Sequence, residues 1–568
     1  MVSRQPLQSR PGSNEKTDEQ DFGQAMIEQR EEASSSGDNA DMPLPAAKGG
    51  NNNGPVRLIP MPTPDPKDPF NLPTWRKLVA IASLCLFGAM AAGAELVLGA
   101  MLPVFSFEYA GINPKLLTKV HLPEGVNALT ILAEFPGPPI VEIYLLASLP
   151  ILMMGATNFV LVPLAIAVGR RNILLVTGII ALAGCMGSGY STSLATHLTG
   201  RVIQAVGAGT IESLIPFILQ DIVFYHQRNA AISVVFATQG LIIVALGVAA
   251  PYVIGYASWR VIYYATAGAG LVFWICMFFF LPETKFERSL DEQNGISSVP
   301  LREGQIRPDI DYENYTPRTW KEDLKLFQCK VNWNEGLTAF WDCIRTFFYP
   351  HIFFITLLNS AVIALALAAG YTVAPQLLAD PWSWSFYHLG FCLFPLIVAA
   401  GASFLISGWG ADQVANWLAK KHGRRNPEFQ ALNLVIPCVV GLVGSLLFGF
   451  AGDDPAKYHW MVFLLGLGMI GFAFLATNTI GIVYVLESYP HLTGPALVNI
   501  ASFRLLIAFV LSFRVSEWVA ELGYRKTFIM YAGILGAFIL FIPVIYTWGD
   551  RWRKRWPALP KTRAASSV

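Results

Sequence analysis

Charged residues are scarce in this chain. Only 14% of its 568 residues are Asp, Glu, Lys or Arg, whereas 54% are hydrophobic. A soluble domain usually carries about 25% charged residues because its surface must be solvated. The apolar residues also come in runs of about 20, the length that crosses a hydrocarbon core ~30 Å thick. The composition excludes a soluble globular domain and predicts an all-α integral membrane protein.

Cysteine is also sparse, and its placement excludes two kinds of site. The seven cysteines are scattered along the chain without a C-x-x-C pair. Five of them lie in apolar runs, where a thiol behaves as a small hydrophobe. The sequence therefore predicts neither a disulfide framework nor a metal site.

Nucleotide-binding loops are missing as well. The strings Gly207-x-Gly209 and Gly268-x-Gly270 lie inside apolar runs, with no preceding strand and no following Gly-Lys-Ser/Thr. No Ser/His/Asp arrangement rises above chance, so we expect no enzyme activity. We also expect no cofactor, with a proton gradient in place of ATP as the energy source. The net charge of +1 gives no indication of a nucleic-acid partner, and none is expected.

Twelve apolar runs form two sets of six, which a long polar segment separates. The expected membrane spans are 77–102, 142–165, 172–192, 197–220, 230–254, 260–281, 351–375, 386–408, 430–451, 459–485, 494–516 and 526–547. Around them the sequence predicts a disordered acidic cytosolic tail at 1–70, an N-terminal six-helix bundle at 71–285, a cytosolic connector at 286–350, a C-terminal six-helix bundle at 351–550 and a basic cytosolic tail at 551–568.

Basic residues indicate the orientation of the spans. Loops rich in Lys and Arg follow the second, fourth, eighth and twelfth spans, and the opposite loops are poorer in them. The positive-inside rule therefore favours both termini in the cytosol. Within the connector, Trp333–Phe348 is amphipathic enough to lie on the membrane face.

Several short motifs carry a family resemblance by their order and spacing. They are LAIAVGRR at 164–171, RVIQAVGAG at 201–209 and LPET at 281–284, with shorter matches at 68–71, 221–228 and 259–260. Together they resemble the fungal branch of the major facilitator superfamily, in particular its twelve-span drug:proton antiporter group, over residues 65–555. The resemblance implies two pseudo-symmetric six-helix bundles around a central cavity that opens alternately to each side.

Charged residues inside the spans need a reason, since each costs roughly 2.5–3.5 kcal/mol on insertion. Glu95 and Glu212 are our candidate proton or cationic-substrate carboxylates, because burial favours the neutral form of a carboxyl group. Arg201 matches the arginine that the family associates with proton coupling. It lies eleven positions before Glu212, roughly 16 Å along a helix, so the two cannot pair. The alternative for each is a buried ion pair that only fixes helix packing.

Two glycine–arginine strings are candidate gating elements. Gly169, Arg170 and Arg171 follow the second span, and their counterparts Arg424 and Arg425 follow the eighth. The arginines are expected to bond helix-end carbonyls and carboxylates of the facing bundle. The acidic residue usual in the family is replaced by Ile166 in the first half, whereas Asp412 is present in the second. The alternative is plain topology signalling.

Further candidates lie on spans five, seven, ten and eleven. Gly247 and Pro251 resemble an incomplete form of the family's antiporter motif and suggest close helix approach and a hinge. Asn359, Asn478 and Arg504 are candidate cavity-lining or gating residues, although helix–helix bonding is the stronger interpretation.

These observations predict a monomeric, multi-pass plasma-membrane protein that exchanges a small molecule for protons across the lipid bilayer. The leading hypothesis is export of an amphipathic metabolite or xenobiotic. One alternative is proton symport of a cationic nutrient such as a polyamine, and another is a membrane sensor that has lost transport.

Overall fold

The computed structural model describes residues 58, 60–96, 98–113, 137–224, 228–293, 295–302, 305–325, 331–422, 426–489 and 492–556. Within these ranges every regular element is a helix. Most of the expected acidic tail and most of the basic tail lie outside them. Twelve helical stretches in the described part are long and apolar enough to cross a membrane, as the sequence predicts.

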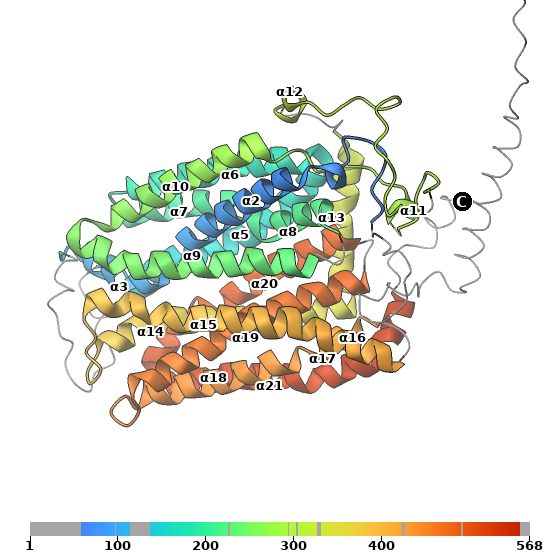
Figure 1. The fold of residues 1–568 in the computed structure, drawn as a ribbon. Helices are drawn as coiled ribbons and strands as arrows, with labels where there is room; N and C mark the ends of the chain where they lie inside the picture. The colour runs from blue at the N-terminus through green and yellow to red at the C-terminus, as the bar shows by residue number, and fades with distance from the viewer. Residues whose placement is uncertain are drawn as a thin grey trace, which may run out of the picture.

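The first six spans form one group of packed helices, drawn in the upper part of Figure 1. Their bounds are α2 Thr74–Leu96, α3 Leu98–Tyr109, α5 Ile140–Val168, α6 Arg170–Gly189, α7 Leu194–Ala208, α8 Ile211–Ile222, α9 Arg228–Tyr256 and α10 Trp259–Phe280. The first expected span, 77–102, continues through α3 to Tyr109, and the fourth is built from α7 and α8 in succession.

The last six spans form the second group, in the lower part of the same view. Their bounds are α14 Pro350–Leu378, η4 Phe386–Leu393, α15 Phe394–Ser403, η5 Phe404–Gly410, α16 Ala411–His422, α17 Glu428–Leu432, α18 Val435–Asp453, α19 Trp460–Ser488, α20 Thr493–Ser512 and α21 Val515–Arg555. Two elements depart from a regular α-helix. The eighth span is assembled from η4, α15, the π-helical η5 and α16, and α21 bends at Gly523, where φ is 82°.

Small residues bring neighbouring helices of a bundle close together. A Cβ atom at Gly184 of α6 would lie 2.2 Å from the backbone nitrogen of Gln204 on α7. A Cβ atom at Gly207 of α7 would lie equally close to the nitrogen of Ala181 on α6. Such backbone contact needs residues without a side chain, as is common between membrane helices.

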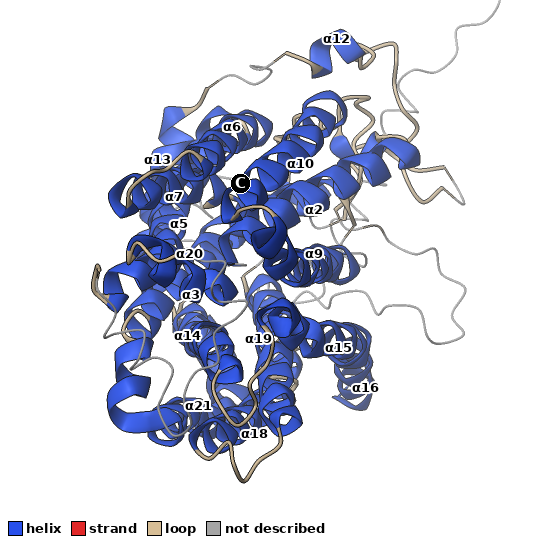
Figure 2. Cartoon of the chain, turned by 90° about the vertical axis from the view of Figure 1, so that its left-hand side faces the viewer, coloured by secondary structure: helices blue, strands red, loops and turns tan. Residues whose placement is uncertain are grey.

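Figure 2 looks along the helices and shows the two groups facing each other, with α20 beside α5 and α14 beside α3. The start of α2, the connector and the end of α21 lie at one end of the molecule, which we name the connector end (Figure 1). The opposite end, beside α3, is named the far end.

The segment before α2 is ordered, which corrects the tail boundary at residue 70. Asp68 is fully buried, accepts hydrogen bonds from the backbone nitrogens of Thr63 and Phe70, and pairs with Arg288 of the connector. The ring of Phe70 stacks on Phe224 at 4.8 Å. Sequence composition alone missed this, because Asp68 is buried by a partner more than two hundred residues away.

The connector packs on the N-terminal bundle. Asp323 lies 2.7 Å from Arg76 of α2 and 2.9 Å from Arg318, and all three side chains are almost entirely buried. Short helices Leu290–Gln293 (α11) and Trp320–Asp323 (α12) belong to this segment, which ends in the longer helix Trp333–Phe347 (α13). The connector is therefore a folded cap rather than a plain polar linker.

Candidate functional site

An ion pair joins the two bundles near the middle of the molecule. Arg504 of α20 donates through Nη2 to Oε2 of Glu212, in the first turn of α8. Their side chains are only 2% and 14% exposed. The N-terminal end of α8 favours a negative charge at Glu212 through the helix dipole. Two residues predicted separately, 292 positions apart, thus form one site.

A third predicted residue completes this site. Arg504 also donates through Nη1 to Oδ1 of Asn478 on α19. The guanidinium therefore binds one neighbour in each bundle. We name Glu212, Arg504 and Asn478 the charged bridge. At low local dielectric such a group is stabilised only while both charges are paired, and removal of one partner costs about 3–5 kcal/mol.

A second polar chain crosses the same interface beside the charged bridge. Ser213 of α8 donates to Oδ1 of Asn158 on α5, and Nδ2 of Asn158 donates to Oγ of Ser502 on α20 at 2.9 Å. The sequence interpretation did not include these residues. A signal was present, because Asn158 is an amide inside an apolar run and Ser213 follows Glu212 directly.

Around these polar groups the bundles touch backbone to backbone. A Cβ atom at Gly155 of α5 would lie 2.8 Å from the carbonyl oxygen of Ser502 on α20. On the other flank, a Cβ atom at Gly390 of η4 would lie 2.6 Å from the carbonyl oxygen of Gly247 on α9. Gly247 is thus a point of close approach between the bundles. Pro251 lies one turn farther along α9.

Aromatic residues close the interface toward the far end. The hydroxyl of Tyr144 on α5 points at the carbonyl oxygen of Tyr371 on α14 at 3.5 Å, and their rings meet edge to face. The ring of Tyr387 lies 5.8 Å from Tyr252 and 6.0 Å from Tyr256. The charged bridge is therefore flanked by inter-bundle contacts on α5, α9, α14 and α20.

Comparison with known proteins supplies the family. The profile described as Major Facilitator Superfamily matches residues 125–509, more than half of the chain. The chain belongs to the major facilitator superfamily. Family membership makes it a membrane transporter rather than an enzyme, and the two bundles are the two halves of the major facilitator fold.

Individual relatives and structures agree with this assignment. An uncharacterized MFS-type transporter of Schizosaccharomyces pombe is 21% identical, with 89% of each chain covered. The efflux pump vrtL of Penicillium aethiopicum is 21% identical over 75% of this chain and 79% of its own. The xylose transporter XylE of Escherichia coli has the same fold, with a TM-score of 0.54 at 12% identity over 83% of this chain and 97% of its own.

The arginine string after α5 has partners in its own bundle, and its expected contact with the facing bundle stays a prediction. Arg170 pairs with Asp221 at the end of α8. The backbone nitrogens of Arg170 and Arg171 donate to the two oxygens of Glu283 at 3.0 and 3.2 Å. Gly169 makes this possible, because its φ is 127° and a Cβ atom there would lie 2.7 Å from Glu283.

The physical reason is helix capping. Glu283 follows α10 and accepts hydrogen bonds from backbone N–H groups in the first turn of α6. These groups have no partner within their own helix, so a carboxylate is favoured beside them. Nη2 of Arg171 donates to the carbonyl oxygen of Phe278 at 2.7 Å, so this side chain caps the end of α10 in return. Asp221 and Glu283 supply the acid that the motif lacks at Ile166, and both lie in motifs that carried the resemblance.

Arg201 lies inside the N-terminal bundle, apart from the charged bridge. It is fully buried, donates through Nε to the carbonyl oxygen of Leu146 at 3.3 Å, and donates through Nη1 to Oε1 of Gln204 at 3.1 Å. Asn359 donates to the carbonyl oxygen of Ile355 on its own helix at 3.1 Å. These contacts fit helix packing, and a role of Arg201 in proton coupling stays a prediction.

Other predicted residues fall outside what the structure describes. Glu95 belongs to α2 and Asp412 to α16, but their side chains lie outside the described part. Arg424 and Arg425 lie outside it altogether. Their roles as proton-coupling and gating residues stay predictions.

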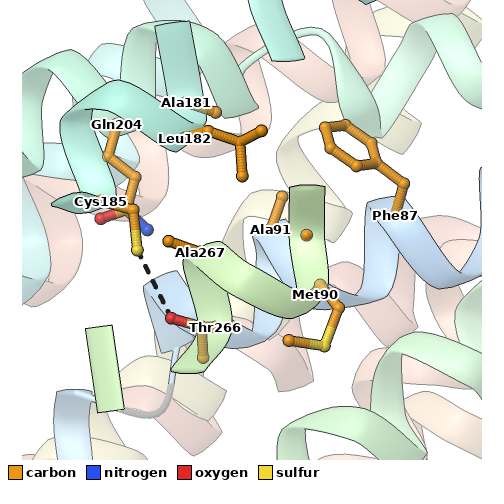
Figure 3. Close-up of a pocket in the computed structure, with 10 residues that line it drawn as sticks. Phe87, Met90, Ala91, Ala181, Leu182, Cys185, Gln204, Thr266 and Ala267 are labelled. Carbon is orange, nitrogen blue, oxygen red and sulfur yellow. Dashed lines mark hydrogen bonds between the residues drawn. The ribbon is translucent and has the colours of Figure 1, made fainter. Parts of the chain in front are cut away.

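A small pocket lies within the N-terminal bundle, between α2, α6, α7 and α10. Figure 3 shows Gln204 and Cys185 near one end of the pocket, with Cys185 hydrogen-bonded to Thr266, and mainly apolar side chains around the rest. Its volume of about 20 Å³ suits a single water molecule rather than a substrate. Within the described residues, no three His, Cys, Asp or Glu side chains gather as metal ligands would.

Proposed function

We propose that this chain is a proton-coupled exporter of a small amphipathic metabolite or xenobiotic, in which Glu212 exchanges the proton. The observation that carries the proposal is the buried ion pair between Glu212 and Arg504, which joins the two bundles. The likeness to an efflux pump supports the direction of transport. The proposed location is the plasma membrane, with both termini in the cytosol as the basic loops favour.

The ion pair couples charge to conformation. Opening the cavity between the bundles moves α8 away from α20, so Glu212 loses Arg504. A buried carboxylate without a partner is strongly disfavoured, and a proton removes that penalty by neutralising it. Protonation of Glu212 therefore favours the separated arrangement, and deprotonation favours the paired one. This is the relation that an antiporter needs between its proton and its conformation.

Arg504 also offers a group for the substrate. Its Nε is buried and has no hydrogen-bond acceptor among the described residues. A carbonyl or hydroxyl oxygen of a substrate can accept from it while the apolar helices around the charged bridge hold the rest of the molecule. An amphipathic compound with one such oxygen matches this surrounding.

The test is transport in liposomes with an imposed pH gradient. A panel of fluorescent amphipathic compounds and labelled polyamines is offered to the purified protein and to the Glu212→Gln variant. We expect proton-driven movement of amphipathic compounds that the variant loses. The matched control is Glu142→Gln, which changes an exposed carboxylate on α5. If transport by the Glu212→Gln variant stays dependent on pH, Glu212 has no part in the mechanism.

The second candidate is proton-coupled uptake of a cationic nutrient such as a polyamine. Its supporting observation is the same buried carboxylate, with the amide of Asn478 one hydrogen bond beyond Arg504. An amine of the substrate can take the place of the Arg504 guanidinium beside Glu212, just as a proton can neutralise this carboxylate when Arg504 is absent. The direction of flux separates the candidates: cells without an exporter accumulate more of its substrate, and cells without an importer accumulate less.

A further inference from the structure

Helix α13 of the connector has three faces rather than two. With about 100° between successive residues, Gly336, Ala339, Cys343 and Thr346 fall on one side, and all four are buried. The exposed side is divided. One part carries Trp333, Leu337 and Trp341, and the other carries Asn334 and Arg345, with the half-buried Thr338 beside them.

The buried face of α13 contacts both bundles. Against α5, a Cβ atom at Gly336 would lie 2.6 Å from Cβ of Ala167. Against α20, Nδ2 of Asn499 donates at 2.8 Å to the carbonyl oxygen of Cys343 and to Oγ1 of Thr346. These contacts hold the rotation of α13 about its axis, so the direction of the exposed faces is fixed by the protein.

Aromatic stacking ties the same helix to both sides. The rings of Phe340 and Phe159 of α5 lie 5.2 Å apart, and Phe347 lies 4.0 Å from Phe503 of α20. Phe159 and Phe503 meet each other at 5.6 Å. The helix therefore bridges the two bundles at the connector end, across the direction of the long helices (Figure 1).

The apolar part of the exposed side has no protein cover in the described chain. Trp333 is 65% exposed, Leu337 and Trp341 are each 59% exposed, and Phe348 directly after the helix is 69% exposed. These residues fall within about 80° of the helix circumference. A helix that faced water would fill its whole exposed side with polar residues, as α13 does only on the part with Arg345.

We propose that this apolar strip, formed by Trp333, Leu337 and Trp341 of α13 and by Phe348 directly after it, is inserted in the membrane–water interface at the connector end. In this arrangement α13 is an amphipathic helix that lies in the interface and links the two bundles. A division of the exposed side into an apolar and a polar part is what a helix at a lipid–water boundary requires. Tryptophan is enriched at this depth because its ring is largely apolar and its N–H is polar.

The bilayer is the occupant that the surroundings favour. Val160 of α5, next to the Phe159 that stacks on Phe340, is 56% exposed on a membrane span, so an outward-facing apolar side chain follows directly on a residue that contacts α13. Arg345 is exposed on the polar part beside the strip, and a basic side chain at a membrane surface is attracted to anionic headgroups. The helix also runs across the spans, as a helix in the plane of the interface must (Figure 1).

The test places a fluorescent probe on each exposed part in turn. Trp341→Cys and Arg345→Cys are labelled with an environment-sensitive fluorophore in a background with Cys276 and Cys329 replaced by alanine. The full-length protein is reconstituted in phosphatidylcholine vesicles with or without brominated acyl chains. We expect brominated lipid to quench the probe at 341, with blue-shifted emission, and aqueous iodide to quench the probe at 345.

Two outcomes would overturn the proposal. Quenching of both probes by iodide, with no effect of brominated lipid, would place the strip in water. Shielding of the probe at 341 from both quenchers would show that protein covers it, either a second copy or another part of this chain. Because the experiment measures position and not transport, its result is independent of the proposed export function.

Discussion

Arg504 binds a neighbour in each bundle at once, and this explains why a costly charge is kept in the core. Removing Glu212 leaves the guanidinium buried without its counter-charge. We expect Glu212→Gln to lower the free energy of unfolding by about 3–5 kcal/mol, measured by thermal unfolding in detergent. The double variant Glu212→Gln/Arg504→Gln should recover most of this stability and still lack pH-dependent transport. A single variant as stable as the parent would contradict the pairing.

The thiol of Cys343 gives a second prediction for a single residue. Burial raises its pKa to about 12, because desolvation disfavours the thiolate. At pH 8 the thiolate that reacts with maleimides is therefore almost absent, and its fraction should rise only as the pH approaches that value. We expect no labelling of Cys343 in the folded protein and full labelling after denaturation. Mass spectrometry measures the labelled fraction. Labelling of Arg345→Cys, two residues away and exposed, is the control.

Sequence reasoning could single out polar side chains inside the spans, but not the partners that they contact. Glu212, Arg504 and Asn478 stand out because polar groups inside apolar runs need a reason, and the structure joins them. Their pairing could not be predicted, because the facing of α8, α19 and α20 depends on how two bundles meet. Arg201 and Asn359 stood out equally, yet the hydrogen bonds described for them above lie within the halves of the protein that carry them.

The crossing of α9 and η4 shows how a pair of elements depends on its glycines. A Cβ atom at Gly390 would lie 2.5 Å from Cα of Val248. We expect Gly390→Ala to push the bundles apart, cost about 1–3 kcal/mol of stability and reduce the transport rate. Gly370→Ala on α14 is the matched control, because a Cβ atom there meets nothing within 4 Å. Equal behaviour of the two variants in thermal unfolding and flux would rule out a role for this crossing.

Elements with a strong pattern were predictable, and those shaped by distant contacts were not. The amphipathic segment at Trp333–Phe348 became α13, close to its expected bounds. The segment 60–70 was expected to belong to the disordered tail, because residues 1–70 are rich in proline and polar residues and have few large apolar ones. It is held instead by Asp68 and Arg288, and such a tertiary contact leaves no local signal.

The whole molecule is two bundles that close on each other between α5 and α20. A Cβ atom at Gly155 would lie 3.1 Å from Cβ of Leu505, closer than the roughly 3.5–4.5 Å of bridged cysteines, so a cross-link here requires α5 and α20 to shift slightly apart. We expect Gly155→Cys/Leu505→Cys to form a disulfide under mild oxidation that blocks transport, with recovery after reduction. The single variants, treated identically, show the effect of each substitution alone. Unimpaired flux in a fully cross-linked sample would mean that transport does not require α5 and α20 to separate.

The twelve-span plan was the most predictable property of the whole molecule. Hydrocarbon thickness fixes the length of every span, so each apolar run reports a helix without knowledge of its neighbours. For the same reason, the sequence of a span does not reveal how that span packs against the others. Lipid-facing and protein-facing surfaces of a span are equally apolar, so composition cannot show which surface meets the other bundle.

The ion pair between the bundles also has a consequence for biogenesis. Ribosomes make α8 before α20, and 292 positions separate Glu212 from Arg504. During that interval the nascent helix has a carboxylate in the bilayer and no counter-charge. If Glu212 exchanges a proton as proposed, insertion of the first half is easiest while this carboxyl group is neutral, and pairing with Arg504 follows once α20 is made. Folding of the second bundle onto the first thus resembles one half-cycle of the transport proposed for the mature protein.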